Sequence, residues 1–169
     1  MTDSSRLDMA IGQIEFARRY MLQLVAELPE DDWFRTPDGA TTHVAWQVGH
    51  LAVAEYGLCL FRMRGRQDGD AELLPSSFRK QFSKGSQPSG DRSRYPAPRE
   101  IREILDQVHS QAMRELPGYS AADLDQPAEE PYAVWPTKLG ALIFCSMHEM
   151  MHAGQIGLLR RLMGISPIR

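Results

Sequence analysis

The chain has 169 residues, of which 43% are hydrophobic, so it can bury a substantial core and we expect one domain spanning residues 1–169. A formal net charge of −3 and a pI near 5.9 leave no broad cationic face for a phosphate backbone, which disfavours nucleic-acid binding. No stretch approaches the roughly 18 apolar residues of a membrane span, and no signal peptide is evident, so we expect a cytoplasmic protein with no membrane partner.

The first predicted element is an amphipathic helix. Apolar residues recur at three- and four-residue steps over residues 7–28, and the polar residues Ser4 and Ser5 are candidate caps. Pro29 ends this pattern. Residues 29–40, which contain further proline, aspartate and glycine, are predicted to form a loop.

A second helix is predicted to begin after Thr41 or Thr42, either of which can cap it, and to extend to about Arg64. A connection rich in Gly, Pro, Ser and charged residues follows over residues 65–97. It holds one short helical pattern, at residues 77–82, and we expect an ordered functional loop.

The last two predicted helices share a high content of apolar residues at helical spacing. Pro98 suits the first turn of a third helix that ends near Leu116, and a polar connection follows over residues 119–136. Thr137 then caps a long, strongly apolar helix over residues 138–163. Since no alternating strand pattern is present, the sequence predicts an all-α fold, an antiparallel four-helix bundle with long loops between helices two and three and between helices three and four.

Residues 148–152 read HEMMH and form the clearest chemical motif of the chain. On a helix, His148 and His152 lie one turn apart on the same face, close enough to bind one divalent metal. In zinc proteases the glutamate of this motif, here Glu149, is the general base, and a further ligand follows along the chain. Residues 153–169 contain no His, Cys, Asp or Glu. A third ligand must therefore come from upstream.

The choice of third ligand falls among three upstream histidines. His43 lies at a helix start among capping residues and is expected to be exposed, and His109 lies among polar residues on an expected solvent face. His50 lies in the middle of an apolar helix, where an imidazole needs a partner. Helices of a bundle project side chains toward one another, so His50 can complete a three-histidine site with His148 and His152. A histidine hydrogen-bonded in the core is the common alternative.

Other residues near the motif have two interpretations each. Trp46 and Gln47 lie within one turn of His50, and Gln155 lies three residues after His152, so all three are candidates to line a pocket. They can equally be core or ordinary polar helix residues. Cys145 is a conceivable thiolate ligand, although a buried small residue is the commoner role. Glu149 is the candidate catalytic residue, as a base on a metal-bound water, but a structural contact with another helix is favoured.

Several segments together resemble the DinB-like superfamily. They are Gly49-His50-Leu51 with Glu55 in the second helix, the connection from Gly85-Ser86 to Tyr95-Pro96, and HEMMHAGQI followed by Leu159-Arg160-Arg161. The resemblance covers nearly the whole chain. It implies a four-helix bundle, commonly a homodimer, with a divalent metal held at His50, His148 and His152. Relatives include transferases and isomerases that use mycothiol, bacillithiol or glutathione, in which the metal activates the cofactor thiol; many members have no established activity.

Two functional hypotheses follow from these observations. The first is a divalent-metal-dependent enzyme with a three-histidine site for zinc, nickel or iron, acting on a small molecule as a thiol-dependent transferase or a hydrolase. The second is a non-catalytic metal-binding or small-ligand-binding stress protein. A metalloprotease is disfavoured, because a small helical bundle offers neither a sheet edge nor a cleft between lobes for an extended peptide.

Overall fold

The computed structural model describes residues 3–128 and 135–168. Its helices are, in chain order, α1 (Asp3–Ala26), the 3₁₀ helix η1 (Glu30–Phe34), α2 (Val44–Glu55), the π-helix η2 (Tyr56–Phe61), α3 (Arg62–Arg64), α4 (Asp70–Leu73), α5 (Ser76–Phe82), the 3₁₀ helix η3 (Arg92–Arg94), α6 (Pro98–Glu115), the 3₁₀ helix η4 (Leu116–Gly118), α7 (Ala121–Leu124) and α8 (Lys138–Leu162). No strand occurs in these residues beyond an isolated bridge between Pro127 and Thr137. The prediction of an all-α fold is confirmed.

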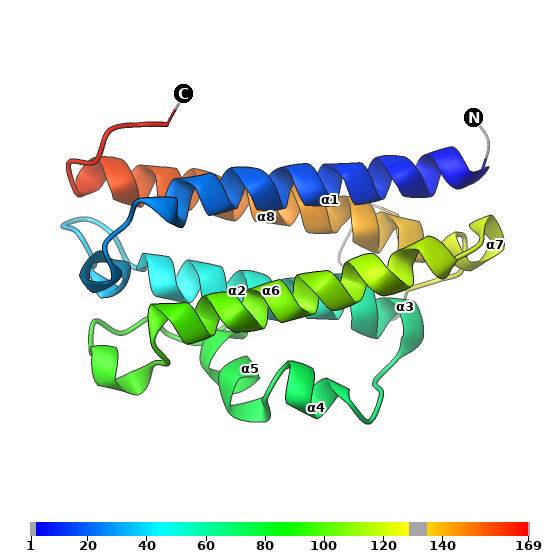
Figure 1. Ribbon diagram of the computed structural model, residues 1–169, viewed down its shortest axis with the longest axis horizontal. Helices are drawn as coiled ribbons and strands as arrows, with labels where there is room; N and C mark the ends of the chain where they lie inside the picture. Colours follow the sequence, from blue (N-terminus) through cyan, green and yellow to red (C-terminus); the bar gives the residue numbers. More distant parts are fainter. Residues whose placement is uncertain (1–2, 129–134, 169) are drawn as a thin grey trace.

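The four long helical stretches lie in two pairs, α1 beside α8 and α2 beside α6 (Figure 1). Within each pair the helices run in the same direction, and the two pairs run in opposite directions. The expected antiparallel order therefore applies between the pairs and not within them. Because α2 and α6 are parallel, residues 65–97 must return along the length of the molecule, and they do so through α4 and α5, below the α2–α6 pair in Figure 1.

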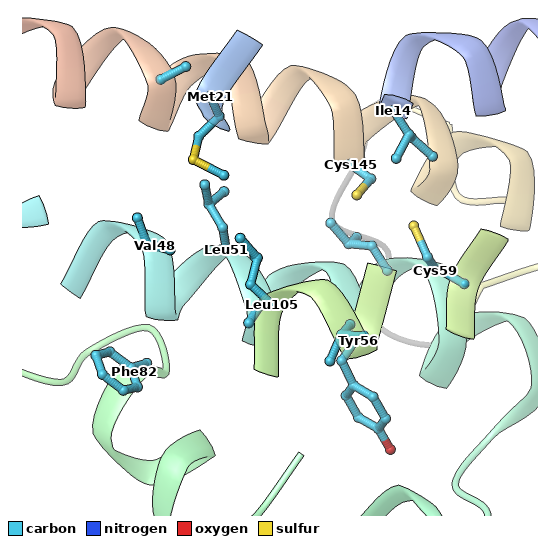
Figure 2. Close-up of a cluster of buried hydrophobic side chains, with 14 of the residues drawn as sticks. Ile14, Met21, Val48, Leu51, Tyr56, Cys59, Phe82, Leu105 and Cys145 are labelled. Carbon is cyan, nitrogen blue, oxygen red and sulfur yellow. The ribbon is translucent and has the colours of Figure 1, made fainter. Parts of the chain in front are cut away.

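Apolar side chains from both pairs fill the space between them. Ile14 and Met21 of α1 face Leu51 of α2 and Leu105 of α6, and each of the four is at most 2% exposed (Figure 2). Complete burial of one such side chain contributes about 1.5–3 kcal/mol. The core thus fixes how the two pairs lie against each other.

Helix α2 continues into η2 and α3, so the predicted second helix ends at Arg64 as expected. The π segment Tyr56–Phe61 within it has wider turns than an α-helix, and such segments occur often at functional sites. Gly65 then ends the helix with a φ of 75°, a left-handed backbone conformation that favours glycine.

The helix beginnings were predicted with mixed success. Thr137 caps α8 as expected, with its hydroxyl accepting from the Gly140 amide at 3.1 Å. The predicted cap of α2 was wrong: the N-cap is His43, whose Nδ1 accepts from the Trp46 amide at 3.1 Å. The serine caps of α1 were also wrong, because α1 already begins at Asp3.

His43 is also fully buried, which corrects its expected exposure. Its ring packs between Phe34 and Tyr95, with centroid distances of 5.6 and 5.1 Å. The cap is therefore the point at which η1 and the segment before α6 contact the start of α2. Of the connections expected to be loops, residues 29–40 contain η1 and residues 119–136 contain α7, and part of the second connection lies outside the described residues.

None of the helices in the described ranges combines the length and the apolar character that a membrane crossing requires.

Candidate metal centre

Three histidines from two helices converge at one point. His50 of α2 lies opposite His148 and His152 of α8, with ring centroids 5.3 and 4.9 Å from them, and the two α8 rings are 4.5 Å apart. One nitrogen from each ring can be chosen so that all three lie within 4.8 Å of one another. We call these residues the histidine cluster. The structure brings together the three residues that the sequence selected as metal ligands.

Hydrogen bonds fix the orientation of two of these rings. The Nδ1–H of His50 donates to the carbonyl of Phe82 at 2.7 Å, and the Nδ1–H of His152 donates to Oε1 of Gln47. A histidine that donates from Nδ1 has an unprotonated Nε2 available for a metal, and such outer contacts are typical of metal sites. Gln47 thus acts on the cluster through His152. Gln155 is exposed, and it does not line the cavity described below.

The Nε2 atoms of His148 and His152 lie 3.2 Å apart. Because the Nδ1 bond leaves a lone pair on Nε2 of His152, the two nitrogens can approach this closely only if a proton or a cation lies between them. A divalent metal would fill that role with better geometry and would use the lone pair of His50 as well. The arrangement of donors therefore fits a metal.

The close packing of Phe82 against α2 depends on Gly49. A Cβ atom at this position would lie 2.4 Å from the Phe82 ring, well inside the distance that real contacts reach. The absence of a side chain lets α5 end directly on α2, and this places the Phe82 carbonyl at His50. Gly49 and His50 therefore act together: Gly49 admits the Phe82 ring, and His50 donates to the Phe82 carbonyl.

Trp46 covers the other face of His50. The two rings are stacked at 4.8 Å with an interplanar angle of 6°, and the indole Nε1–H donates to Oγ of Ser86 at 2.9 Å. Trp46 thus joins the cluster to the chain that follows α5, and it restricts the rotation of the His50 ring.

Burial keeps the histidine cluster neutral. Together with a smaller effect of the neighbouring histidines, it lowers the pKa of His148 to about 4 and that of His152 to about 3. Burial also lowers the pKa of His50, and its bond to Phe82 offsets only part of this. At neutral pH the imidazoles are therefore unprotonated, as metal ligands must be.

A second polar cluster lies on the other side of α8. Arg18 of α1 donates from Nε to Glu149 of α8 and from Nη2 to Glu55 of α2, both at 2.7 Å, and Nδ1 of His109 in α6 donates to Glu55 at 2.7 Å. We call Arg18, Glu55, His109 and Glu149 the charge cluster. Because it contains one residue from each long helix, it fixes their mutual positions.

The charges of this cluster are almost entirely removed from water. Arg18, Glu55 and Glu149 are at most 3% exposed, and His109 is half-buried, which corrects its expected solvent-facing position. Burial favours a raised pKa for Glu55, but Arg18 and His109 outweigh it and hold the pKa below its ordinary value. For Glu149 burial prevails over Arg18, and its pKa is raised. Sequence reasoning missed Arg18 altogether, although Glu55 was part of the family resemblance.

Cys145 takes no part in the histidine cluster. It faces Cys59 in the core, and this contact and burial raise the pKa of its thiol well above the ordinary value (Figure 2). A protonated thiol is a poor metal ligand.

A cavity of about 170 Å³ opens beside the histidine cluster. His50 and His148 form part of its wall, and the remaining lining residues come from α2, η2, α3, the chain after α5, and α8: Val53, Ala54, Gly57, Leu58, Arg62, Lys84 and Phe144. A metal at the cluster would thus have protein ligands on one side and the cavity on the other. Three protein ligands with an open position are typical of catalytic rather than structural metal sites.

The fold and the site together define a helical protein with a candidate three-histidine metal centre between two of its helices. Comparison with protein families gives its membership: the family model of the DinB superfamily matches residues 13–156, and the chain belongs to that superfamily. The match covers α2 and α6 and the histidine cluster completely. Comparison with curated proteins finds no match.

Proposed function

We propose that the protein is a divalent-metal-dependent enzyme that transfers a small thiol to, or hydrolyses, a small-molecule substrate. The observation that carries this proposal is the histidine cluster, whose ligand atoms converge beside a cavity. Zinc, nickel and iron(II) suit three imidazole nitrogens. The cytoplasm is the expected compartment.

The chain's own residues supply the conditions for such chemistry. His50, His148 and His152 would hold the metal through Nε2, while Phe82 and Gln47 keep the rings of His50 and His152 in place. Since all three ligands are neutral, a bound divalent metal keeps its charge and lowers the pKa of a thiol or water in the cavity. The apolar part of the wall limits the access of bulk water to that position.

Glu149 is assigned a structural role in this proposal. Its carboxylate is 2% exposed, bonds Arg18 at 2.7 Å, and does not line the cavity. A general base must reach the proton that it abstracts, directly or through one water. The protease mechanism, in which the glutamate of HExxH activates a water, is therefore not favoured for this chain.

Metal titration tests the site. We expect the purified chain to bind one equivalent of zinc or nickel, and we expect the His148→Ala variant to lose stoichiometric binding because only two ligands remain. The matched control is His109→Gln, which changes a histidine of the charge cluster and should retain the metal. Full metal content in His148→Ala would refute the site.

Activity measurements then separate the enzyme from the binding protein. Electrophiles are screened with several low-molecular-weight thiols, with and without chelator, and thermal unfolding is followed in parallel. Chelator-sensitive thiol transfer supports the enzyme. A large loss of thermal stability on chelation, with no transfer for any thiol, would instead support a metal-stabilised binding protein.

We also propose that the protein forms a homodimer through the apolar face of α1 and α8. Side chains on this face are large, apolar and at least 38% exposed: Met9, Phe16, Ile143, Met147, Met150, Met151, Leu158 and Leu162. The α8 members recur at helical spacing, and a shallow groove joins Met9 and Phe16 to Met147 and Met150. Sedimentation of Met147→Glu should show monomers, whereas Phe61→Glu, a change at an exposed aromatic of η2, should leave the dimer intact.

A further inference from the structure

The wall of the cavity beside the histidine cluster is mostly apolar. Helix α2 and η2 supply four lining residues at three- and four-residue steps, which therefore share one face of the second helix: Val53, Ala54, Gly57 and Leu58. Helix α8 supplies Phe144 and His148, which lie one turn apart with ring centroids separated by 5.7 Å. The cavity is thus bounded by one face of the second helix and by α8.

Two small residues leave this space open. Gly57 has a helical backbone, so no left-handed conformation requires glycine there, and glycine stabilises a helix less than alanine does. A Cβ atom at Gly57 would meet only Nη1 of Arg62 outside its own helix backbone, at 3.4 Å. Ala54, three residues earlier, adds only a methyl group to the same face. A larger side chain at either position would extend into the cavity.

His50 gives the cavity a ligand-binding atom. Its side chain is 9% exposed, and its Nδ1–H donates to the Phe82 carbonyl at 2.7 Å, so Nε2 retains a lone pair. His50 and His148 both belong to the wall, so a ligand in the cavity reaches the histidine cluster. Arg62 and Lys84 complete the wall. A ligand there therefore contacts apolar side chains and the histidine cluster together.

The volume of the cavity fits one small apolar group. It is about 170 Å³, and an apolar cavity of roughly 150 Å³ in an engineered protein binds one benzene molecule. An apolar group favourably displaces the water that contacts apolar side chains. A group the size of one six-membered ring would fill this cavity, and a second ring would lie outside it.

We propose that the small-molecule ligand of the histidine cluster carries an apolar group of about one six-membered ring next to its donor atom, and that Gly57 and Ala54 provide the space for this group. The inference rests on the proposed metal site for the position of the donor atom. It adds a ligand class and two specificity-determining residues, neither of which belongs to the histidine cluster. Recognition comes from the removal of apolar surface from water rather than from charge.

Thiols that differ in apolar content test this ligand class. The protein is loaded with cobalt(II), and the thiolate-to-cobalt absorption is followed as phenylmethanethiol or the polar 2-mercaptoethanol is added. We expect phenylmethanethiol to bind more tightly by about tenfold to a hundredfold, the gain expected when one aromatic side chain is buried. 2-Naphthylmethanethiol should gain little beyond this, because its second ring lies outside the cavity. Equal affinities for phenylmethanethiol and 2-mercaptoethanol would overturn the proposal, and a further large gain for the naphthyl thiol would overturn the size limit.

Substitutions that fill the cavity test the two residues. Gly57→Leu should remove most of the preference for phenylmethanethiol, and Ala54→Leu, which fills the cavity from one turn earlier, decides if Gly57→Leu fails to fold. Gly69→Leu is the matched control and should retain the full preference. Gly69 also has a helical backbone and no atom within 4 Å of an added Cβ, but it is exposed before α4 and does not line the cavity. An unchanged preference in both Gly57→Leu and Ala54→Leu would overturn their assignment.

Benzene separates this inference from the proposed function. It is titrated into chelator-treated protein, in which no metal contributes, and the amide chemical shifts of the cavity residues are followed. We expect saturable shifts at these residues in the wild-type protein and in Gly69→Leu, but not in Gly57→Leu. If cobalt fails to bind while benzene binds in this way, the metal site is refuted and the apolar cavity is supported. If cobalt binds while the thiol preference and the benzene shifts are both missing, only the ligand class is refuted.

Discussion

The two polar clusters that involve α8 differ in whether their polar atoms are all paired within the protein or can still bind a ligand. In the charge cluster, every buried carboxylate contacts Arg18, and the four residues come from four helices. In the histidine cluster, the outer nitrogens of His50 and His152 are bonded while the inner ones face one another beside a cavity. His148 and Glu149 are neighbours in sequence and belong to different clusters. Buried polar groups that are fully paired support the fold, whereas convergent lone pairs beside a cavity indicate a ligand.

The largest effect is expected from Arg18→Met. This change leaves the carboxylates of Glu55 and Glu149 buried without their cation, which costs about 3–5 kcal/mol in comparable buried pairs. The free energy of unfolding of the metal-free protein, measured by urea denaturation at pH 7, should fall by that amount.

A triple variant gives the control for this prediction. Adding Glu55→Gln and Glu149→Gln to Arg18→Met removes the uncompensated charges, and it should recover a substantial part of the lost stability. A loss below about 1 kcal/mol in Arg18→Met alone, the range of exposed ion pairs, would contradict the structural role given to the charge cluster.

A smaller effect is expected from Gly49→Ala. The new methyl group would overlap the Phe82 ring, so α5 must shift and the Phe82 carbonyl must move from His50. Overpacking of this kind costs about 1–3 kcal/mol, and the loss should appear in unfolding and in metal affinity together. Gly154→Ala on α8, where no atom lies within 4 Å of the new Cβ, should be neutral or stabilising. If Gly49→Ala and Gly154→Ala had the same stability and the same metal affinity, the close approach at Gly49 would not be what positions the Phe82 carbonyl at His50.

The next prediction compares two glutamines near His152. Gln47→Leu removes the acceptor of the His152 Nδ1–H, and loss of such a contact lowers metal affinity by about tenfold to a hundredfold. Gln155→Leu changes an exposed side chain and should leave the affinity unchanged. Competition with a chromogenic chelator measures both. Equal affinities of the two variants would mean that Gln47 does not orient the ligand.

The smallest effect is expected from acidification. Three histidines with an ordinary pKa near 6.5 would lose metal affinity by roughly fifty-fold between pH 7.5 and 6, because each must release a proton to bind. In the folded chain the pKa values of His148 and His152 are lowered to about 4 and 3, so these two stay unprotonated over that interval. Their contribution to affinity should therefore change little above pH 6 and be lost steeply only as the pH falls to about 4 and below. A steep fall already near pH 6.5 would show that the cluster is solvated.

The convergence of the three histidines could be predicted because their signals are local. The four-residue spacing of His148 and His152 places both on one helix face, and His50 lies within an apolar stretch that had to be buried. Long helices were found for the same reason, since the apolar period of each is complete within its own segment. Helix directions within the pairs depend on the return path of residues 65–97, and no local pattern encodes that path.

The sequence also contains a pattern that predicts the charge cluster. Arg18 lies at helical spacing from Ile14, Met21 and Val25, all of which are buried, so the period of α1 places an arginine on its buried face. Glu55 lies at helical spacing from the buried residues Leu51 and Ala52, so the period of α2 also places a glutamate on a buried face. A positive and a negative side chain on two buried faces predict a pair.

The contact to His50 had no such signal, because its acceptor is a backbone carbonyl. Any residue at position 82 offers the same oxygen, and only the close approach at Gly49 brings it to His50. The burial of His43 was missed for a related reason: its ring packs against Phe34 across a loop and against Tyr95, which is distant in sequence. Contacts of this kind depend on the assembled fold.

The π segment Tyr56–Phe61 divides the second helix into two parts. Residues before it hold His50, and residues within and after it contribute Gly57, Leu58 and Arg62 to the cavity. A π turn contains one residue more than an α turn, so removal of a single residue there would return it to an α turn and would leave both His50 and Arg62 at their present positions around the helix. One residue could thus be lost at this turn while the positions on either side of it stay aligned, so the helix tolerates here a change of chain length that would misalign an ordinary α-helix.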